Sequence, residues 1–244
     1  MRFLIFFTLC ISAISLTFAF PFKSKDEHIN FLDYPAGAER KQAFIAYLSP
    51  IIEEKNRSLF DDRQKLIHLS QKLKLNIREQ RWLNHISQYY GNDTFDTSDD
   101  TQWSALLEKV DIVPTSLAIA QAAQESGWGS SRFAQEANNY FGQWCYTKGC
   151  GLIPNDRNEN AIHEVAKYKS IKESIVTYIH NLNTNRAYKE FRAIREQLRK
   201  SGQLLTGYQL AKGLQLYSER GHDYVREIQA LIRNNKLSAW KASS

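Results

Sequence analysis

The sequence has few cysteines and lacks the motifs of several large enzyme classes. Its 244 residues include three cysteines and six histidines. The cysteines form no C-x-x-C pair and the histidines show no H-E-x-x-H spacing, so we predict neither a redox dithiol nor a metal site. A glycine-rich phosphate loop and a G-x-S-x-G nucleophile elbow are missing as well. We therefore expect no cofactor, and chemistry by carboxylates is what the sequence leaves available.

Long apolar runs are also missing, with one exception at the N-terminus. Residues 3–16 are apolar and follow Arg2, and Thr17 and Ala19 are the small residues expected before a cleavage site. This layout predicts a secretory signal peptide over residues 1–19. An uncleaved anchor is the alternative, although the run is short for a membrane span of roughly 20 residues. We expect an exported protein with no stable transmembrane segment after signal cleavage.

The charge balance is moderately basic. The chain has 32 Lys and Arg against 26 Asp and Glu, and loss of Arg2 with the signal peptide leaves a net charge of +5. In an exported chain this favours an anionic polymer or a membrane face as partner, and nucleic acid is not expected. Simple solubility explains a charge of this size equally well.

Two cysteines remain after removal of Cys10. Cys145 and Cys150 lie in "CYTKGC", where Gly149 gives the chain freedom to close a short loop. In an exported protein this spacing predicts a structural disulfide, and two reduced thiols are the alternative. Such a loop contributes about 2 kcal/mol on the entropic model. Its main role is then to fix the shape of the segment that carries the neighbouring aromatic residues.

Helical periodicity dominates the rest of the chain, and a 43% apolar composition suffices for one sizeable core. Pro50 is predicted to kink or restart a helical stretch that begins near Ala38. Pro114 opens an alanine-rich central helix ending near Glu125. A small β-hairpin is predicted between Cys150 and Ser170. The expected fold is mainly α with a small β-hairpin lobe, and the other predicted helices cover residues 78–90, 102–110, 171–182, 187–200 and 222–235, with a short one after Thr206.

The central helix delivers a carboxylate, Glu125, directly into the turn "SGWG". Apolar surroundings would keep such an acid protonated near neutral pH, as glycoside hydrolysis requires. Aromatic faces stack on sugar rings, and carboxamides bind hydroxyl and N-acetyl groups. A solvated or hydrogen-bonded helix end with aromatics in the core is the alternative. The predicted substrate-binding residues are Trp128, Asn138, Asn139, Gln143, Trp144 and Tyr146.

The segment "AIAQAAQESGWGSSRFAQEANNYFGQW" resembles the signature of bacterial peptidoglycan N-acetylglucosaminidases, family 73 of the glycoside hydrolases. The combination of E-S-G-W-G with A-N-N-x-F-G carries the resemblance. "WCYTKGCGLIP", "HEVAKY" and "HNLNTNRAY" are similar to the Bax-type exported proteins of Gram-negative bacteria. The resemblance spans about residues 110–235, with a weaker echo over 40–90. It implies a lysozyme-like α+β fold and cleavage of the β-1,4 bond on the reducing side of N-acetylglucosamine.

The resemblance also implies roles for individual residues. Glu125 matches the catalytic acid, and Tyr188 in "NRAY" matches a tyrosine near it, with a core tyrosine as the alternative. A second carboxylate on the β-hairpin is expected at Glu164 or Glu159. We favour Glu164, because it shares a strand face with Ile162 and Ala166, whereas Glu159 lies in an Asn-rich turn. The substrate's own N-acetyl group can also replace this second carboxylate.

The predicted organisation has three parts: the signal peptide, an N-terminal helical segment over residues 20–100, and a glucosaminidase-like catalytic domain over 101–244. The N-terminal segment either packs against the catalytic domain or occludes its cleft. The expected partner is the glycan strand of peptidoglycan, bound by a periplasmic monomer. Two other functions stay open: a lytic transglycosylase giving 1,6-anhydro ends, and a non-catalytic glycan-binding protein.

Overall fold

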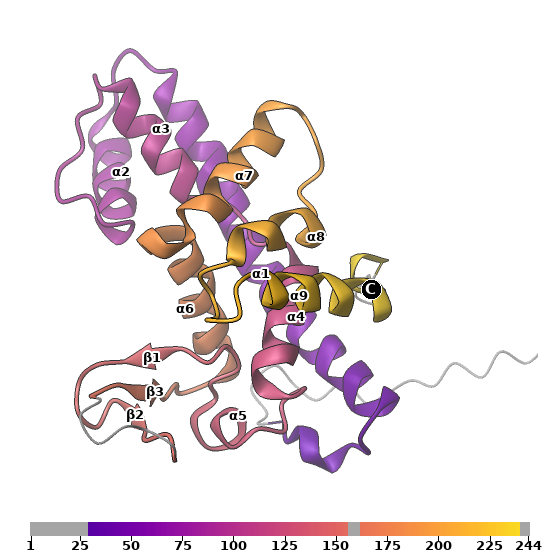
Figure 1. The fold of residues 1–244 in the computed structure, drawn as a ribbon. Helices are drawn as coiled ribbons and strands as arrows, with labels where there is room; N and C mark the ends of the chain where they lie inside the picture. Colours follow the sequence, from indigo (N-terminus) through magenta and orange to yellow (C-terminus); the bar gives the residue numbers. More distant parts are fainter. Residues whose placement is uncertain (1–28, 156–161, 240–244) are drawn as a thin grey trace, which may run out of the picture.

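The computed structural model describes residues 29–155 and 162–239, and its helices form the larger part of the molecule (Figure 1). Three short strands gather on one side of the helices, close to α5 and α6. The α-helices are α1 (Ala38–Ser70), α2 (Ile77–Tyr89), α3 (Asp100–Lys109), α4 (Thr115–Ser126), α5 (Arg132–Ala137), α6 (Ile171–Thr184), α7 (Lys189–Lys200), α8 (Gly207–Leu210) and α9 (His222–Asn234). Short 3₁₀ helices are η1 (Phe31–Asp33), η2 (Arg186–Tyr188), η3 (Ala211–Leu214) and η4 (Leu237–Ala239).

The prediction of a mainly α fold with a small β lobe is confirmed. The strands β1 (Trp144–Cys145), β2 (Gly151–Leu152) and β3 (Glu164–Ala166) form one antiparallel sheet in the order β1-β3-β2. Trp144 pairs with Val165, and Gly151 pairs with Ala166. The lobe therefore contains one strand more than the predicted hairpin, because the chain before the disulfide loop also pairs with β3.

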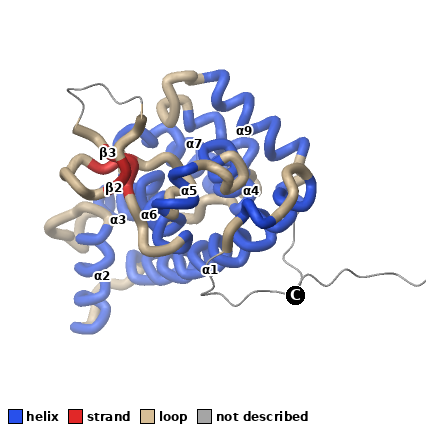
Figure 2. Tube along the Cα trace, turned by 90° about the horizontal axis from the view of Figure 1, so that it is seen from below, coloured by secondary structure: helices blue, strands red, loops and turns tan. Residues whose placement is uncertain are grey.

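Helix α1 continues through Pro50, so the predicted new start at this residue is wrong. Proline removes one backbone N–H, but the apolar face of the helix is buried on both sides of it. Leu48 and Ile52 are fully buried and Ile51 nearly so. Packing of this face holds the helix together across the single missing hydrogen bond. Figure 2 shows the resulting long helix running along one edge of the molecule.

Helix α4 is the central helix, and its small side chains allow close packing on several sides. Residues 116–123 are all buried, and α4 packs against α1, α8 and α9. Gly207, at the start of α8, approaches so closely that a Cβ atom there would lie 2.5 Å from the Ser116 Oγ and 2.7 Å from the Leu117 N. The alanine-rich composition is thus explained by helix packing, which places the C-terminal end of α4 at a junction of elements.

The N-terminal helix shares the hydrophobic core of the remaining helices. Phe44 of α1 packs against Trp128, with ring centroids 5.6 Å apart, and against Tyr140 at 6.1 Å. Asn56 of α1 donates a hydrogen bond to the Val113 carbonyl and accepts one from the Val113 N–H. Buried apolar residues from Ile29 to Leu237 form one cluster. Helix α1 is therefore packed onto α4 and the residues around it.

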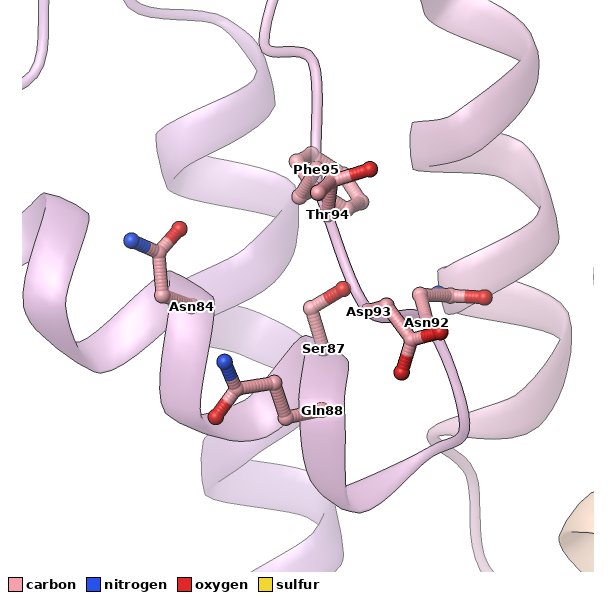
Figure 3. Close-up of a pocket in the computed structure, with 7 residues that line it drawn as sticks. All are labelled: Asn84, Ser87, Gln88, Asn92, Asp93, Thr94 and Phe95. Atoms are coloured by element: carbon pink, nitrogen blue, oxygen red, sulfur yellow. The ribbon is translucent and has the colours of Figure 1, made fainter.

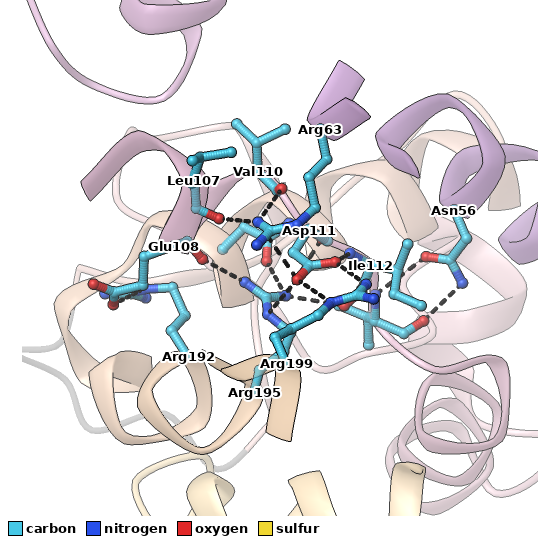
Figure 4. A network of polar contacts seen from close by, with 12 residues as sticks. Asn56, Arg63, Leu107, Glu108, Val110, Asp111, Ile112, Arg192, Arg195 and Arg199 are labelled. Carbon is cyan, nitrogen blue, oxygen red and sulfur yellow. Dashed lines mark hydrogen bonds and ion pairs between the residues drawn. The ribbon is translucent and has the colours of Figure 1, made fainter. Parts of the chain in front are cut away.

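A polar network links helices α1, α3 and α7 (Figure 4). Asp111, just after α3, receives two hydrogen bonds from Arg199 of α7, at 2.7 and 3.0 Å. The guanidinium groups of Arg195 and Arg63 lie 3.8 and 3.6 Å from the same carboxylate. Arg192 pairs with Glu108 at 3.1 Å. The network joins α1, α3 and α7 around the buried charges of Asp111 and Arg195, with Arg199 and Glu108 partly exposed at its edge.

Candidate active site

The turn after α4 fixes the position of Glu125. Gly127 adopts the left-handed conformation that ends the helix, and Trp128 also has a positive φ of 57°. The Ser126 hydroxyl donates to the Ala122 carbonyl at 2.6 Å and accepts from the Gly129 N–H at 2.9 Å. Only glycine fits at Gly129, because a Cβ there would lie 2.3 Å from the Phe31 ring. The sequence E-S-G-W-G therefore encodes one rigid turn that presents Glu125.

Tyrosines from distant parts of the chain surround Glu125. The Tyr224 side chain of α9 is hydrogen-bonded to its carboxyl group. Tyr217 stacks on Tyr224, with centroids 5.5 Å apart and planes inclined by 7°, and Tyr188 lies 5.7 Å from Tyr217. Tyr178 of α6 completes the group at 6.5 Å from Tyr217. The acid is consequently enclosed by aromatic rings and neutral hydroxyl groups.

This environment shifts the acid toward its protonated form. Burial raises the pKa of Glu125, and the hydrogen bond with Tyr224 and the charge of Arg220 offset part of that effect. Burial and the nearby Glu125 carboxylate also raise the pKa of Tyr188 to about 12. The tyrosine hydroxyls therefore stay neutral at physiological pH. A partly buried carboxyl group with a raised pKa is suited to donate a proton.

The A-N-N-Y-F-G segment lies against the acid. Gly142 has a φ of +62°, and a Cβ atom at this residue would come within 3.3 Å of Glu125 Oε2. The preceding Phe141 stacks face to face on Tyr178, with ring centroids 3.9 Å apart. Its carbonyl accepts a 2.7 Å hydrogen bond from the Tyr217 hydroxyl. The two sequence motifs that were singled out thus meet at one carboxyl group.

The carboxamides predicted to bind substrate are used mainly to shape this segment. Asn138 is in the left-handed conformation and donates to the Tyr168 carbonyl at 3.0 Å. Asn139 is 2% exposed, donates to the carbonyls of Gln143 and Ala166, and accepts from two backbone N–H groups. The Gln143 side chain accepts from the Tyr168 hydroxyl at 2.9 Å. These contacts connect the loop to β3.

Trp128 faces α1. Its indole packs edge-on against Phe44, and the Lys41 ammonium lies 5.0 Å from the ring centroid. The ring is half-buried at the edge of the core. Its clearest contacts are therefore with the N-terminal helix, which makes Trp128 a link between α1 and the turn that holds the acid.

Two exposed aromatic residues stand on the β lobe. Trp144 is 55% exposed and stacks on His163, with centroids 4.2 Å apart and planes inclined by 12°. Tyr146 is 67% exposed. An exposed, flat indole held in place by a second ring is the kind of surface on which a sugar ring stacks. Of the predicted substrate-binding residues, these two have the most accessible faces.

The predicted disulfide is confirmed: Cys145 and Cys150 are bonded to each other. Among the described residues, these sulfurs and Glu164 also form a cluster close enough to hold a metal ion. Sulfur atoms joined in a disulfide are not thiolate ligands, so the donor set does not fit a metal. The cluster is instead a covalently closed loop with a carboxylate beneath it.

The Glu164 carboxylate is buried and hydrogen-bonded to the backbone. Glu164 is 4% exposed and accepts hydrogen bonds from the N–H groups of Gly149 and Gly151, at 3.0 and 2.8 Å. Both donors lie in or beside the disulfide loop. Ala166, predicted on the same strand face, is buried, whereas Ile162 is 71% exposed. Glu159, the other predicted carboxylate, lies outside the described residues.

Several residues of the site were not among those singled out from the sequence, namely Gln121, Tyr178, Tyr217 and Tyr224. Gln121 is fully buried and hydrogen-bonded to both Tyr178 and Tyr224. Its position four residues before Glu125, inside an apolar helix, is a signal that can be found in the sequence. The tyrosines carry no local signal, because they reach the acid only through the tertiary fold.

A separate polar pocket lies on the N-terminal segment (Figure 3). It has a volume of about 260 Å³ and is formed by α2 and the loop that follows it. Ser87 is one of its lining residues, and its buried hydroxyl has no hydrogen-bond partner within the described part of the chain. The other lining residues are Asn84, Gln88, Asn92, Asp93, Thr94 and Phe95. None of them belongs to the tyrosine cluster around Glu125.

Comparison with known proteins matches residues 100–237 to the glucosaminidase family, described as mannosyl-glycoprotein endo-beta-N-acetylglucosaminidase. The chain belongs to this glucosaminidase family. It is also similar to Protein bax of Escherichia coli (strain K12), with 34% identity over 203 residues, which cover 83% of this chain and 72% of that protein. No solved structure matches. The predicted resemblance to a Bax-type glucosaminidase-domain protein is therefore confirmed.

Family membership supports a glycosidase kind of function with a glycan substrate. The matched residues include Glu125, Gly142 and Tyr224, so the whole acid site described above lies within the glucosaminidase domain. Pocket-forming residues 84–95 precede it. Within the residues that the structure describes, no helix is both long and apolar enough to cross a membrane. The signal peptide predicted for residues 1–19 falls outside that part of the chain.

Proposed function

We propose that the protein is a peptidoglycan hydrolase in which Glu125 is the general acid. It would cleave the β-1,4 bond on the reducing side of N-acetylglucosamine. The observation that carries the proposal is the burial of Glu125 among neutral tyrosines, which raises its pKa in the matched domain. The disulfide and the similarity to Protein bax support export of the protein to the periplasm, the compartment that contains peptidoglycan. We propose that it acts there as a monomer.

The reaction needs one proton and one water molecule. Glu125 gives its proton to the bridging oxygen while the bond from that oxygen to C1 of N-acetylglucosamine breaks. The positive charge that develops at C1 is relieved by the oxygen of the substrate's 2-acetamido group or by a protein carboxylate. Water then supplies hydroxide to C1, and its second proton restores Glu125. The neutral hydroxyls of the tyrosine cluster leave Glu125 as the site's proton donor near neutral pH.

The contacts of Glu164 bear on its proposed role. Glu164 already accepts two backbone N–H groups, and so we propose that it mainly shapes the loop carrying Trp144 and Tyr146. A direct part in the reaction is a prediction for Glu159 or Glu164 that the variants described below separate. Tyr188 is proposed to bind the N-acetyl carbonyl or to stabilise the positive charge near C1. Its raised pKa keeps it a hydrogen-bond donor.

The products of digestion test the function. Purified sacculi are incubated with the full chain after removal of the signal peptide, and the soluble fragments are identified by mass spectrometry. Reducing N-acetylglucosamine ends are expected. Fragments ending in 1,6-anhydro-muramic acid would instead assign a lytic transglycosylase. No release above that of a Glu125→Gln control would assign a non-catalytic glycan-binding protein.

A further inference from the structure

A directed chain of hydrogen bonds leads to Glu125 from inside the protein. The Tyr178 hydroxyl donates to Gln121 Oε1 at 2.6 Å, and Gln121 Nε2 donates to the Tyr224 hydroxyl oxygen at 2.9 Å. Tyr224 in turn is hydrogen-bonded to Glu125. Tyr178 and Gln121 are fully buried and Tyr224 is 2% exposed. Water therefore has little access to this chain, and each member depends on the next for its partner.

Counting donors and acceptors gives the chain one direction. A carboxamide nitrogen can only donate, so the Tyr224 oxygen accepts from Gln121 and its single proton is left for Glu125. The reversed chain needs Gln121 turned over, with its oxygen toward Tyr224 and its nitrogen toward Tyr178. Tyr224 would then donate to Gln121, and only a protonated Glu125 could supply the bond between Glu125 and Tyr224. The orientation of one buried carboxamide thus decides which group donates at the acid.

We propose that Gln121 and Tyr178 are positioning residues that act through Tyr224 and fix its hydroxyl as the donor to one oxygen of Glu125. The proton that Glu125 transfers is then held on its other oxygen. Tyr178 stabilises this arrangement because its hydroxyl proton requires the carboxamide oxygen as acceptor. The link to catalysis rests on the proposed role of Glu125, whereas the direction of the chain rests on the two hydrogen bonds of the Gln121 carboxamide.

Within the part of the chain that the structure describes, the other charged and titratable groups near Glu125 are one arginine and the tyrosines of the cluster. Arg220, in the loop before α9, is the only cation that influences its pKa among the described residues, and Arg220 is paired with Glu227. The tyrosines are held neutral by burial. Four tyrosines have pKa values that the Glu125 charge raises: Tyr178 of α6, Tyr188 of η2, Tyr217 of the loop after η3 and Tyr224 of α9.

A direct titration of Glu125 tests the inference without relying on activity. The full chain is labelled with ¹³C, and the Glu125 carboxyl signal is assigned by its loss in Glu125→Gln. Tyr178→Phe removes one hydroxyl while keeping the ring. The arrangement that favours the carboxylate then loses a stabilising bond, so the Glu125 pKa is expected to rise by roughly half to one unit. An unchanged or lowered pKa would overturn the proposal.

Tyr217→Phe is the matched control. Tyr217 belongs to the same cluster and is partly buried there, whereas Tyr178 is fully buried, but the Tyr217 hydroxyl donates to the Phe141 carbonyl and not into the chain. Its removal should leave the Glu125 pKa nearly unchanged, and a shift as large as that of Tyr178→Phe would also overturn the proposal. Gln121→Met, which keeps the side-chain size, is expected to raise the pKa too, and it replaces Tyr178→Phe should that variant not fold.

Kinetics separate this inference from the proposed function. If Glu125 is the acid, activity falls as pH rises through its pKa. Tyr178→Phe then moves this alkaline limb of the kcat/KM profile to higher pH by the same number of pH units as the pKa shift seen by NMR. A pKa shift seen by NMR without any movement of the limb would refute Glu125 as the acid and leave the positioning chain intact. A missing NMR shift would refute the chain, whatever the activity.

Discussion

Glu125 and Asp111 are two acidic residues in buried surroundings of one fold, and their partners have opposite effects. Glu125 is surrounded by tyrosine hydroxyls, and burial raises its pKa. For Asp111, burial alone would raise the pKa, but the hydrogen bonds from Arg199 and the charges of Arg195 and Arg63 outweigh it and lower the pKa. One environment favours the protonated form of its acid, and the other favours the ionised form. The choice of partner, more than burial, separates a proton donor from a structural anion.

Burial and charge pairing also have opposite effects on the pKa of the arginines around Asp111. Arg195 is fully buried, and burial lowers its pKa to about 10 although Asp111 raises it. It also donates to the Ile112 carbonyl at 2.9 Å and to Asn183 Oδ1 at 2.7 Å. A guanidinium group with so many partners has a defined position. The charge network therefore serves to hold helices α1, α3 and α7 together, in contrast to the acid site, where charge is avoided.

The largest effect is expected for Glu125→Gln. Glutamine keeps the size of the side chain and can still accept from Tyr224, but it cannot transfer the proton. General acid catalysis contributes about 10²–10⁴-fold, so the release of fragments from sacculi should fall by at least that order. Near-normal turnover would remove Glu125 from the mechanism. The far-ultraviolet circular dichroism spectrum should match that of the parent protein.

Asp111→Asn, in contrast, should mainly lower the free energy of unfolding. It leaves Arg195 and Arg63 without their buried counter-charge, which typically costs about 3–5 kcal/mol. Urea denaturation measures the change. The control is Asp223→Asn, which breaks the exposed pair with Arg226 and should leave the unfolding free energy almost unchanged. Equal effects of the two variants would show that the network contributes little.

Glu164→Gln sharpens the comparison with a third carboxylate. Glutamine turns one acceptor of the Gly149 and Gly151 N–H groups into a donor, so stability should fall by about 1–3 kcal/mol. Turnover should fall less than for Glu125→Gln and more than for Glu159→Gln, measured side by side on the same sacculi. A loss equal to that of Glu125→Gln, without destabilisation, would identify Glu164 as catalytic. A greater loss in Glu159→Gln would move the site to that residue.

The smallest effect concerns stability and pH. Because the pKa of Glu125 is raised in the folded state, its favourable contribution is present below the unfolded pKa and is lost as pH rises through the folded value. Glu125→Gln does not titrate, so its stability relative to the parent protein should increase with pH across this range. Thermal midpoints at a series of pH values measure the difference. A stability of Glu125→Gln that falls relative to the parent protein as pH rises would contradict the raised pKa.

Local sequence patterns predicted the elements of this site better than their assembly. Alanine spacing, Pro114 and the turn with Gly127 and Gly129 identified helix α4 and the position of Glu125 at its end, and the cysteine spacing identified the disulfide. A new helix start, one of the two alternatives predicted at Pro50, was wrong, because tertiary packing outweighs one missing hydrogen bond. The partner Tyr224 is almost one hundred residues from Glu125 in the sequence. No periodicity or turn signal spans that distance, so this contact had to come from the fold.

The β lobe shows a second limit of local patterns. Alternation predicted that Glu164 would share one face of a strand with Ile162 and Ala166. In the structure all three residues of the strand are buried, because β1 and β2 flank it and the disulfide loop covers the carboxylate. Alternation separates two faces of a strand only where one face meets solvent. The extra strand and the loop removed that difference.

The packing of α1 has a consequence for how the chain folds. Phe44 meets Trp128 and Tyr140, and the Lys41 ammonium donates to Asn235, 194 residues further along the chain. The residues of this long helix are therefore synthesised before most of their partners exist. Contacts between such distant residues carry a large loop-closure cost and slow folding. A fragment starting at residue 100, where the family match begins, would expose the surface of Trp128 that α1 covers, and it should aggregate more readily than the full chain.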